Sequence, residues 1–222
     1  MQIMRKLFGG LAMSWRTIII FALIAGAITG VVAVLPFTEN TSLRDIAISY
    51  EWWLIFAFVI ASNCSKNWES ALKVFVFFLI SQPLCYAVEV VICTLAPELT
   101  PNPLTLDMAL YYYTSIWGPM TLLTLPGGFI AFYITKQNAL GSVILGLGNA
   151  IQAILGVYYL TTMIQNPPYH LLTTVLCFAS IFVMTMSMQR ERKNRAIALG
   201  VTVAAAVLVV AFVFVRNGMP GA

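Results

Sequence analysis

The chain has 222 residues, of which 60% are hydrophobic and only 9% are charged, and its mean hydropathy is +0.90. A soluble domain carries about a quarter charged residues, so this composition excludes an ordinary water-soluble protein. The net charge of +4 does not indicate a nucleic-acid partner, because the basic residues flank apolar segments. We therefore expect an all-α, polytopic helix bundle in the cell membrane, with membrane lipids as its surroundings.

The first sixteen residues are predicted to form a cytoplasmic interfacial segment. Apolar residues recur at helical spacing around Arg5 and Lys6, which is typical of a short helix lying on a membrane surface. An unstructured tail fits the same residues. A secretory signal is not expected, because the first apolar run continues to spanning length with no small-residue cleavage site.

Seven apolar segments follow, each close to the roughly 20 residues that a helix needs to cross the hydrocarbon. They cover Thr17 to Phe37, Ser42 to Ser62, Ala71 to Ala96, Met108 to Ile134, Ala139 to Ile164, Tyr169 to Met188 and Ala196 to Val215. We expect a single transmembrane domain over 17–215 and a short C-terminal tail over 216–222. The number of spans is seven, or six if the last segment does not cross.

The basic residues provide an independent test of this topology. Seven spans place ten cations on one side of the membrane and only Arg44 and Arg216 on the other. The larger set consists of Arg5, Lys6, Arg16, Lys66, Lys73, Lys136, Arg190, Arg192, Lys193 and Arg195. Positive charge concentrates on the cytoplasmic side, so the bias predicts a cytoplasmic N-terminus and an external C-terminus.

Two carboxyl groups fall inside predicted spans, where a charge costs several kcal/mol. From the rise of a helix, Glu89 lies about 13 Å and Glu51 about 9 Å below the outer surface. Neither has an obvious cationic partner, since Lys and Arg cluster towards the span ends. Each carboxyl is either neutral and hydrogen-bonded within the bundle, or charged and facing a cavity that admits a cation. For Glu51, a place at the head-group boundary is a third reading.

Other polar and aromatic residues are predicted at the same level. Gln152 and Asn149 lie three residues apart and share one helix face. Trp117 lies beside Gly118-Pro119, where the proline frees a backbone carbonyl, and Tyr113 lies one turn earlier. Broken helices mark solute sites in transporters, but they also occur as ordinary kinks. Other aromatic residues near the outer ends, Trp53 among them, fit an interfacial belt.

These residues predict an acidic and aromatic ligand site that is open to the outside. Glu89, helped by Glu51, would supply charge, while Trp117 and Tyr113 would offer ring faces to a cation. Gln152 and Asn149 would add hydrogen bonds. The leading hypothesis is a small membrane transporter, or a substrate-binding membrane subunit, for a small organic cation. The alternative is a non-transporting interaction, assembly or sensor protein with a sealed bundle.

Enzymatic and metal chemistry are disfavoured. His170 is the single histidine, so a multi-histidine metal site is impossible, and it is expected to be an interfacial residue. The four cysteines show no CxxC spacing, and no phosphate loop or GxSxG elbow occurs. We expect no catalytic residues, no metal and no cofactor. A lipid-modifying enzyme that uses Glu89 ranks below the other hypotheses.

Ala22, Gly26 and Gly30 form a stripe of small residues at a spacing of four in the first span. Such stripes allow close helix contact, either inside the bundle or with a partner membrane subunit. With at least six spans and an outward-facing site, this plan resembles the substrate-binding subunits of energy-coupling-factor vitamin transporters. In that family, the stripe contacts the coupling subunit. The predicted seventh span and external C-terminus depart from the family plan.

Overall fold

The computed structural model describes residues 6–34, 43–99, 103–165, 167 and 170–217, and within these ranges the chain is all-helical. Sequence predictions that involve Arg5, Phe37, Ser42, Tyr169 or the tail beyond 217 lie outside the described residues. Six helical segments are long and apolar enough to cross a membrane. They are α2 (Trp15–Ala33), α6 (Asn67–Leu95), the continuous segment Leu106–Thr135, α9 (Ala139–Gln165), α10 (Leu171–Met188) and α11 (Arg192–Asn217). The chain is therefore an integral multi-pass membrane protein.

The second predicted span is not one continuous helix. The chain forms α4 (Asp45–Ile48) and α5 (Tyr50–Ser62), and between them Ser49 has an extended backbone with ψ of 142°. The 13 residues of α5 give a helix of about 20 Å, which is shorter than the ~30 Å of hydrocarbon. This break places Glu51 in the first turn of a new helix inside the bundle.

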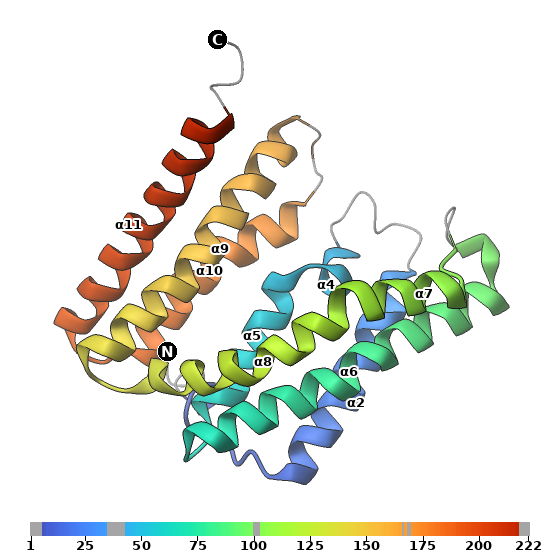
Figure 1. The fold of residues 1–222 in the computed structure, drawn as a ribbon, viewed down its shortest axis with the longest axis horizontal. Helices are drawn as coiled ribbons and strands as arrows, with labels where there is room; N and C mark the ends of the chain where they lie inside the picture. Colours follow the sequence, from blue (N-terminus) through green and yellow to red (C-terminus); the bar gives the residue numbers. More distant parts are fainter. Residues whose placement is uncertain (1–5, 35–42, 100–102, 166, 168–169, 218–222) are drawn as a thin grey trace.

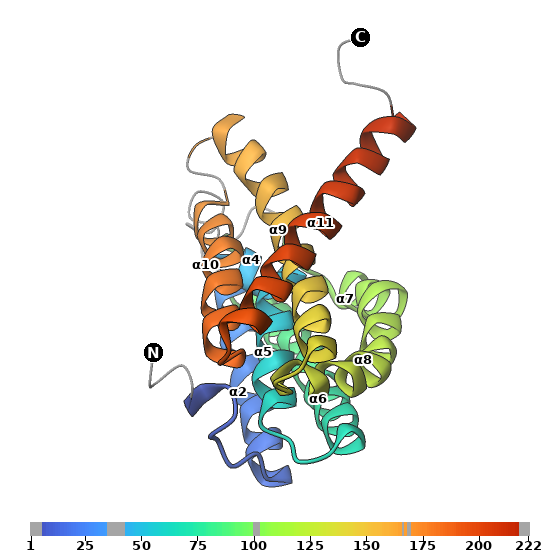
Figure 2. The same ribbon diagram turned by 90° about the vertical axis from the view of Figure 1, so that its left-hand side faces the viewer.

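The helices form two groups that meet at α5 (Figures 1 and 2). In one group, α2 and α8 (Gly118–Ala131) pack against α6. In the other, α10 and α11 pack against α9. Helix α5 lies between the groups and contacts α6 and α8 on one side and α10 on the other. The space next to α5 is therefore where the two groups come together.

Close helix contact within each group depends on small residues. A Cβ added at Gly26 would lie 2.6 Å from the main-chain oxygen of Ser81, and one at Gly30 would lie 2.6 Å from that of Cys85. A Cβ added at Gly146 of α9 would lie 2.6 Å from the main-chain oxygen of Ala198 in α11. The stripe in α2 thus packs against α6 of the same chain. A partner subunit would have to displace α6 to reach it, so the stripe is accounted for by packing within the bundle.

The helical segment Leu106–Thr135 is irregular just before Gly118-Pro119, where the sequence predicted a proline that frees a backbone carbonyl. Helix α7 (Leu106–Tyr112) passes into a π-helical turn, η2 (Tyr113–Trp117), before α8 begins. The N–H of Gly118 donates to the carbonyl of Tyr113, and Pro119 has no N–H to continue the regular pattern. The segment ends in a 3-10 turn, η3 (Phe132–Thr135). By contrast, α6 stays helical through Pro83.

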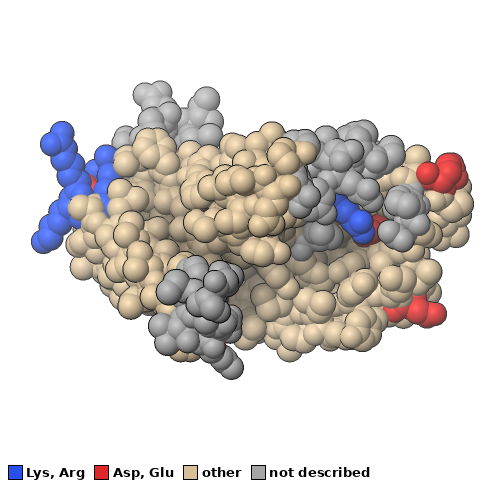
Figure 3. All heavy atoms as spheres, turned by 90° about the horizontal axis from the view of Figure 1, so that it is seen from above, with Lys and Arg blue, Asp and Glu red and all other residues tan. Residues whose placement is uncertain are grey.

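The surface is apolar along the helices, and many polar side chains are buried, as lipid surroundings require. Exposed apolar residues include Leu122, Phe182 and Val203, whereas Asn149 and Gln152 are fully buried. On the face shown in Figure 3, a group of Lys and Arg side chains lies at one end and two groups of Asp and Glu side chains lie at the opposite end, with a further basic group between them. This face is therefore more basic at one end and more acidic at the other.

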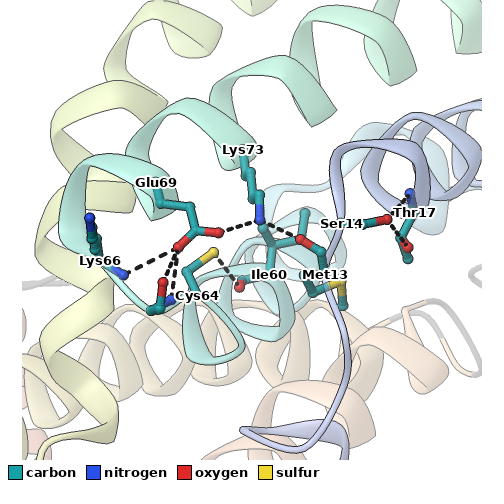
Figure 4. A network of polar contacts seen from close by, with 9 residues as sticks. Met13, Ser14, Thr17, Ile60, Cys64, Lys66, Glu69 and Lys73 are labelled. Carbon is teal, nitrogen blue, oxygen red and sulfur yellow. Dashed lines mark hydrogen bonds and ion pairs between the residues drawn. The ribbon is translucent and has the colours of Figure 1, made fainter.

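A polar network holds the segment before α2 against the bundle (Figure 4). Lys73 of α6 is buried and donates both to Glu69 and to the main-chain oxygen of Met13. Asn63, after α5, accepts from the N–H groups of Gly9 and Leu11 at 3.1 and 2.7 Å. The described part of the predicted interfacial segment is thus attached to the bundle at the end where α5 finishes.

Candidate functional site

A cavity of about 370 Å³ lies between the two helix groups, next to α5. Helix α5 contributes Tyr50, Glu51, Trp53, Leu54, Ala57 and Phe58, and α6 contributes Val74 and Phe78. Trp117 of the π-helical turn lines the cavity together with Met120, Leu123, Thr124, Gly127, Gly128 and Ala131 of α8, and α9 adds Ile151 and Leu155. Its size is that of a pocket for a small organic molecule.

The cavity is elongated and reaches the surface. Its lining along α8 runs from Trp117 to Ala131, a distance of about 21 Å at helical rise. Leu123 of α8 at 60% and Ile151 of α9 at 51% are strongly exposed lining residues, and Tyr50 of α5 is 42% exposed. The cavity therefore approaches the surface between α8 and α9 and also beside Tyr50.

Glu51 supplies the carboxyl group of the cavity wall. Its side chain is 1% exposed, and its Oε2 atom has no hydrogen-bond partner among the described residues. The break at Ser49 makes Glu51 a first-turn residue of α5, where the helix dipole and free N–H groups favour a negative charge. The main chain of Glu51 is held by Gln152, whose Nε2 donates to its carbonyl oxygen at 3.4 Å. The Tyr159 side chain of α9 is hydrogen-bonded to the Glu51 carboxyl, and the buried Oε2 atom is left without a partner next to the cavity.

Aromatic rings surround the same part of the cavity. The ring centroid of Trp117 lies 4.9 Å from that of Tyr50 and 6.4 Å from that of Trp53. The indole N–H of Trp53 donates to the carbonyl of Ala47 at 3.1 Å, and that of Trp117 acts as a donor toward the hydroxyl of Tyr86. Both indoles therefore use their N–H groups within the protein, and their rings form part of the apolar packing around the cavity. Trp53 is 1% exposed, so its predicted place in an interfacial belt is wrong.

The structure brings together part of the predicted site. Glu51 and Trp117 line the cavity, and Gln152 supports Glu51 from α9. Asn149, on the same face of α9, is directed away and donates to the Thr185 hydroxyl at 2.9 Å. Tyr113 packs against the hydrophobic core and is not a lining residue.

Glu89 lies apart from the cavity, although it was predicted to carry the main charge. It is 6% exposed on α6 and is not among the lining residues. Arg44 lies close enough for its charge to act on the Glu89 carboxyl. Arg44, at the start of the second segment, is therefore the cation whose charge acts on Glu89 of the third, although the two side chains form no ion pair among the described contacts. The reading of Glu51 as a head-group residue is wrong, since Glu51 is buried.

A second polar cluster lies close to Glu51, and the sequence reasoning missed it. Nδ1 of His170 lies 2.7 Å from Oδ2 of Asp45, and the Thr173 hydroxyl donates to the same oxygen at 2.6 Å. His170 has a left-handed φ of 58° at the start of α10, and its ring centroid lies 4.7 Å from that of Tyr159. Asp45 and His170 are 125 residues apart, so no local pattern connects them. This cluster joins α4 to α9 and α10 beside the cavity.

Metal-binding potential can be judged from the same residues. Among the described residues, no group of three or more His, Cys, Asp or Glu side chains is placed to hold a metal ion. The pairing of His170 with Asp45 differs from the interfacial role expected for this histidine. In the described chain, the chemistry of the cavity is that of one carboxyl group and aromatic rings.

The fold and the cavity together define a multi-pass membrane protein with an internal, partly open space large enough for a small molecule. Comparisons of the chain with family models, with curated proteins and with solved structures gave no match. The function therefore has to be inferred from the geometry of the cavity.

Proposed function

We propose that this protein binds a small organic cation with an apolar body in the cavity beside Glu51, as a membrane transporter or as the substrate-binding membrane subunit of one. The observation that carries the proposal is the Glu51 carboxyl in the wall of an aromatic cavity: it is buried, its described neighbour is Tyr159, and its Oε2 atom lacks a hydrogen-bond partner among the described residues. A ligand that supplies positive charge and a donor would complete this environment.

Electrostatics support a cation over a neutral or anionic ligand. An isolated carboxylate in a low-dielectric interior is costly, and a paired cation offsets that cost. Among the described residues, no Lys or Arg lines the cavity. The nearby Asp45 adds a second acidic group and is occupied by His170 and Thr173. The cavity therefore attracts positive charge that the chain itself does not supply there.

The shape of the cavity supports an apolar body attached to the cationic group. Glu51, Tyr50 and Trp117 lie at one end, and the space extends along α8 to Gly128 and Ala131 between apolar side chains. At Gly128, the backbones of α8 and α6 come close, and the Ser70 hydroxyl donates to the Gly128 carbonyl at 2.6 Å. A charged head beside Glu51 with an apolar body along α8 would match both regions.

Transport follows from this site combined with a topology of seven crossings and a cytoplasmic N-terminus. In this topology, α4 and α5 form the second crossing, and the cavity's carboxyl lies towards its outer end. A discontinuous helix that starts beside the ligand is a recurring arrangement in solute carriers. The broken second segment and the π-helical turn at Trp117 both adjoin the cavity, and these two irregular backbones support a transport role.

Three carboxyl variants test the proposal. Purified protein in nanodiscs is titrated with a panel of amines and alkylammonium ions, and binding is followed by isothermal calorimetry. Glu51→Gln keeps the size of the side chain but removes the charge, so we expect an affinity loss of about tenfold or more. Glu98→Gln, at an exposed position after α6, is the control and should bind like the parent protein.

The third variant, Glu89→Gln, separates the cavity from the other buried carboxyl. Because Glu89 does not line the cavity and is close to Arg44, we expect binding to persist. Loss of binding in Glu89→Gln, with retention in Glu51→Gln, would move the site to α6. If folded protein binds no cation in the panel, the proposal fails.

The second candidate is a non-transporting interaction or assembly protein. The observation in its favour is that several buried polar side chains hold helices together, as Asn149 does with Thr185 and Ser70 does with Gly128. Under this reading, Glu51 and Gln152 would act in the same way. A protein whose cavity accepts no small molecule from the panel, but which copurifies with a defined membrane partner, would favour this candidate.

A further inference from the structure

We propose that the cavity selects a tertiary or quaternary ammonium over a primary ammonium carrying the same apolar body. This inference rests on the proposed function and names the class of cation that the cavity recognises. It depends on the balance between hydrogen-bond acceptors and aromatic surface around Glu51.

Acceptors are scarce around the place where the cationic group would lie. A primary ammonium brings three N–H donors, and each donor left unpaired in an apolar site loses its hydration without replacement. The acceptors there are Glu51, whose carboxyl already holds Tyr159, and, further along α8, the Thr124 hydroxyl, which donates to the Thr121 carbonyl at 2.6 Å and can accept one donor. Most other lining residues are apolar or aromatic. A primary ammonium would therefore lose more hydration than the cavity returns.

Aromatic surface is abundant in the same place. Trp117 lies at interplanar angles of 41° to Tyr50 and 61° to Trp53, so the three rings are tilted against one another and not stacked flat. Their indole N–H groups bond to Ala47 and toward Tyr86 and do not compete for the ligand. The N-methyl groups of a substituted ammonium carry part of its charge and pack against such rings. Glu51 then needs to supply charge and at most one hydrogen-bond acceptor.

The π-helical turn gives this arrangement a structural origin. Tyr113–Trp117 lies directly before Gly118-Pro119, and the wider turn ends at Trp117. π-Helical turns re-aim side chains and occur often at functional sites. Trp117 is thus presented to the cavity by an irregular backbone, opposite the irregular start of α5.

The test uses five ligands with one apolar body. They are 3-phenylpropylamine, its N-methyl, N,N-dimethyl and N,N,N-trimethyl forms, and the neutral isostere with a tert-butyl group in place of trimethylammonium. Affinities are measured by calorimetry with the full chain in nanodiscs of zwitterionic lipid, and empty nanodiscs correct for partition. We expect affinity to rise with methylation, by about tenfold from the primary to the quaternary form. The neutral isostere should bind about tenfold more weakly than the quaternary form.

Two variants assign the preference to the rings. Trp117→Leu should reduce the ratio of quaternary to primary affinity, while Trp117→Phe, which keeps a ring and a similar fold, should retain most of it. Equal or tighter binding of the primary amine would overturn the inference but leave the proposed function standing. Equal binding of the neutral isostere would overturn both, and so would the absence of binding for all five ligands.

Discussion

The side-chain amide of Gln152 in α9 donates to the main-chain carbonyl of Glu51 in α5 over 3.4 Å, and it joins residues 101 positions apart. This contact connects the α9–α11 group to the helix that carries the cavity's carboxyl group. Oε1 of Gln152 and Oε2 of Glu51 each lack a partner among the described residues. Two buried side-chain oxygens are therefore left without a partner where the two helix groups meet.

Gln152→Met should weaken ligand binding with little effect on stability. It removes one long hydrogen bond together with an unpaired acceptor, so the free energy of unfolding should change by less than about 1 kcal/mol. Glu51 would lose its tether to α9, and affinity should fall about threefold to tenfold. The matched control is Asn149→Leu, on the same buried face but bonded to Thr185. Equal affinity losses in the two variants would contradict a specific role for Gln152.

Leu123→Trp should slow ligand entry. Leu123 is an exposed lining residue at the opening between α8 and α9, so a larger side chain there narrows the entrance. We expect the association rate, measured by stopped-flow fluorescence, to fall about tenfold. The neighbouring Leu122 is 62% exposed and does not line the cavity, so Leu122→Trp should leave the rate unchanged. Unchanged association in Leu123→Trp would place the entrance elsewhere.

Gly26→Ala should destabilise the protein by about 1–3 kcal/mol, because the new Cβ would lie 2.6 Å from the main-chain oxygen of Ser81. Helices α2 and α6 would have to separate. Gly200→Ala is the matched control, since a Cβ there meets nothing within 4 Å and alanine favours a helix by up to about 1 kcal/mol. Unfolding by SDS titration in mild detergent measures both. A fully stable Gly26→Ala protein would contradict the close contact.

Lys73→Met should release the segment before α2 from the bundle. The buried Lys73 ammonium donates to Met13 and Glu69, so its removal leaves the Met13 carbonyl without this donor. We expect faster hydrogen exchange and proteolysis in residues 6–13. Lys66→Met, at an exposed position in the same network region, should leave both rates unchanged. Equal protection in the two variants would show that Asn63 alone holds the segment.

Cys64 should react slowly with maleimide, with a rate that rises about tenfold per pH unit. Burial raises the pKa of its thiol to about 11, and the thiol donates to the Ile60 carbonyl at 3.2 Å. The thiolate fraction therefore stays near one in a thousand at pH 8 and increases as the pH approaches 11. Cys64→Ala supplies the background rate, because the other three cysteines are buried. Rapid labelling at pH 7 would contradict this environment.

The sequence alone indicated that this protein is surrounded largely by lipid, and it predicted most of its helices. Apolar runs of spanning length can satisfy their backbone groups in lipid only as helices, so Ala139 to Ile164 closely anticipated α9, and Ala71 to Ala96 anticipated most of α6. The sequence also singled out Glu51, Trp117 and Gln152, because polar groups and prolines are costly within a membrane.

The tertiary structure decided which of these residues share a site. Helical rise gives depth along a span but not the direction in which a side chain faces, so the sequence placed Glu89 and Glu51 at comparable depth and assigned the main charge to Glu89. Packing set them apart: Glu51 lines the cavity, and Glu89 lies near Arg44. The break at Ser49 and the pairing of Asp45 with His170 depend on contacts between distant segments. Local periodicity carries no information about such contacts, and they place Glu51 where α5 meets the cavity.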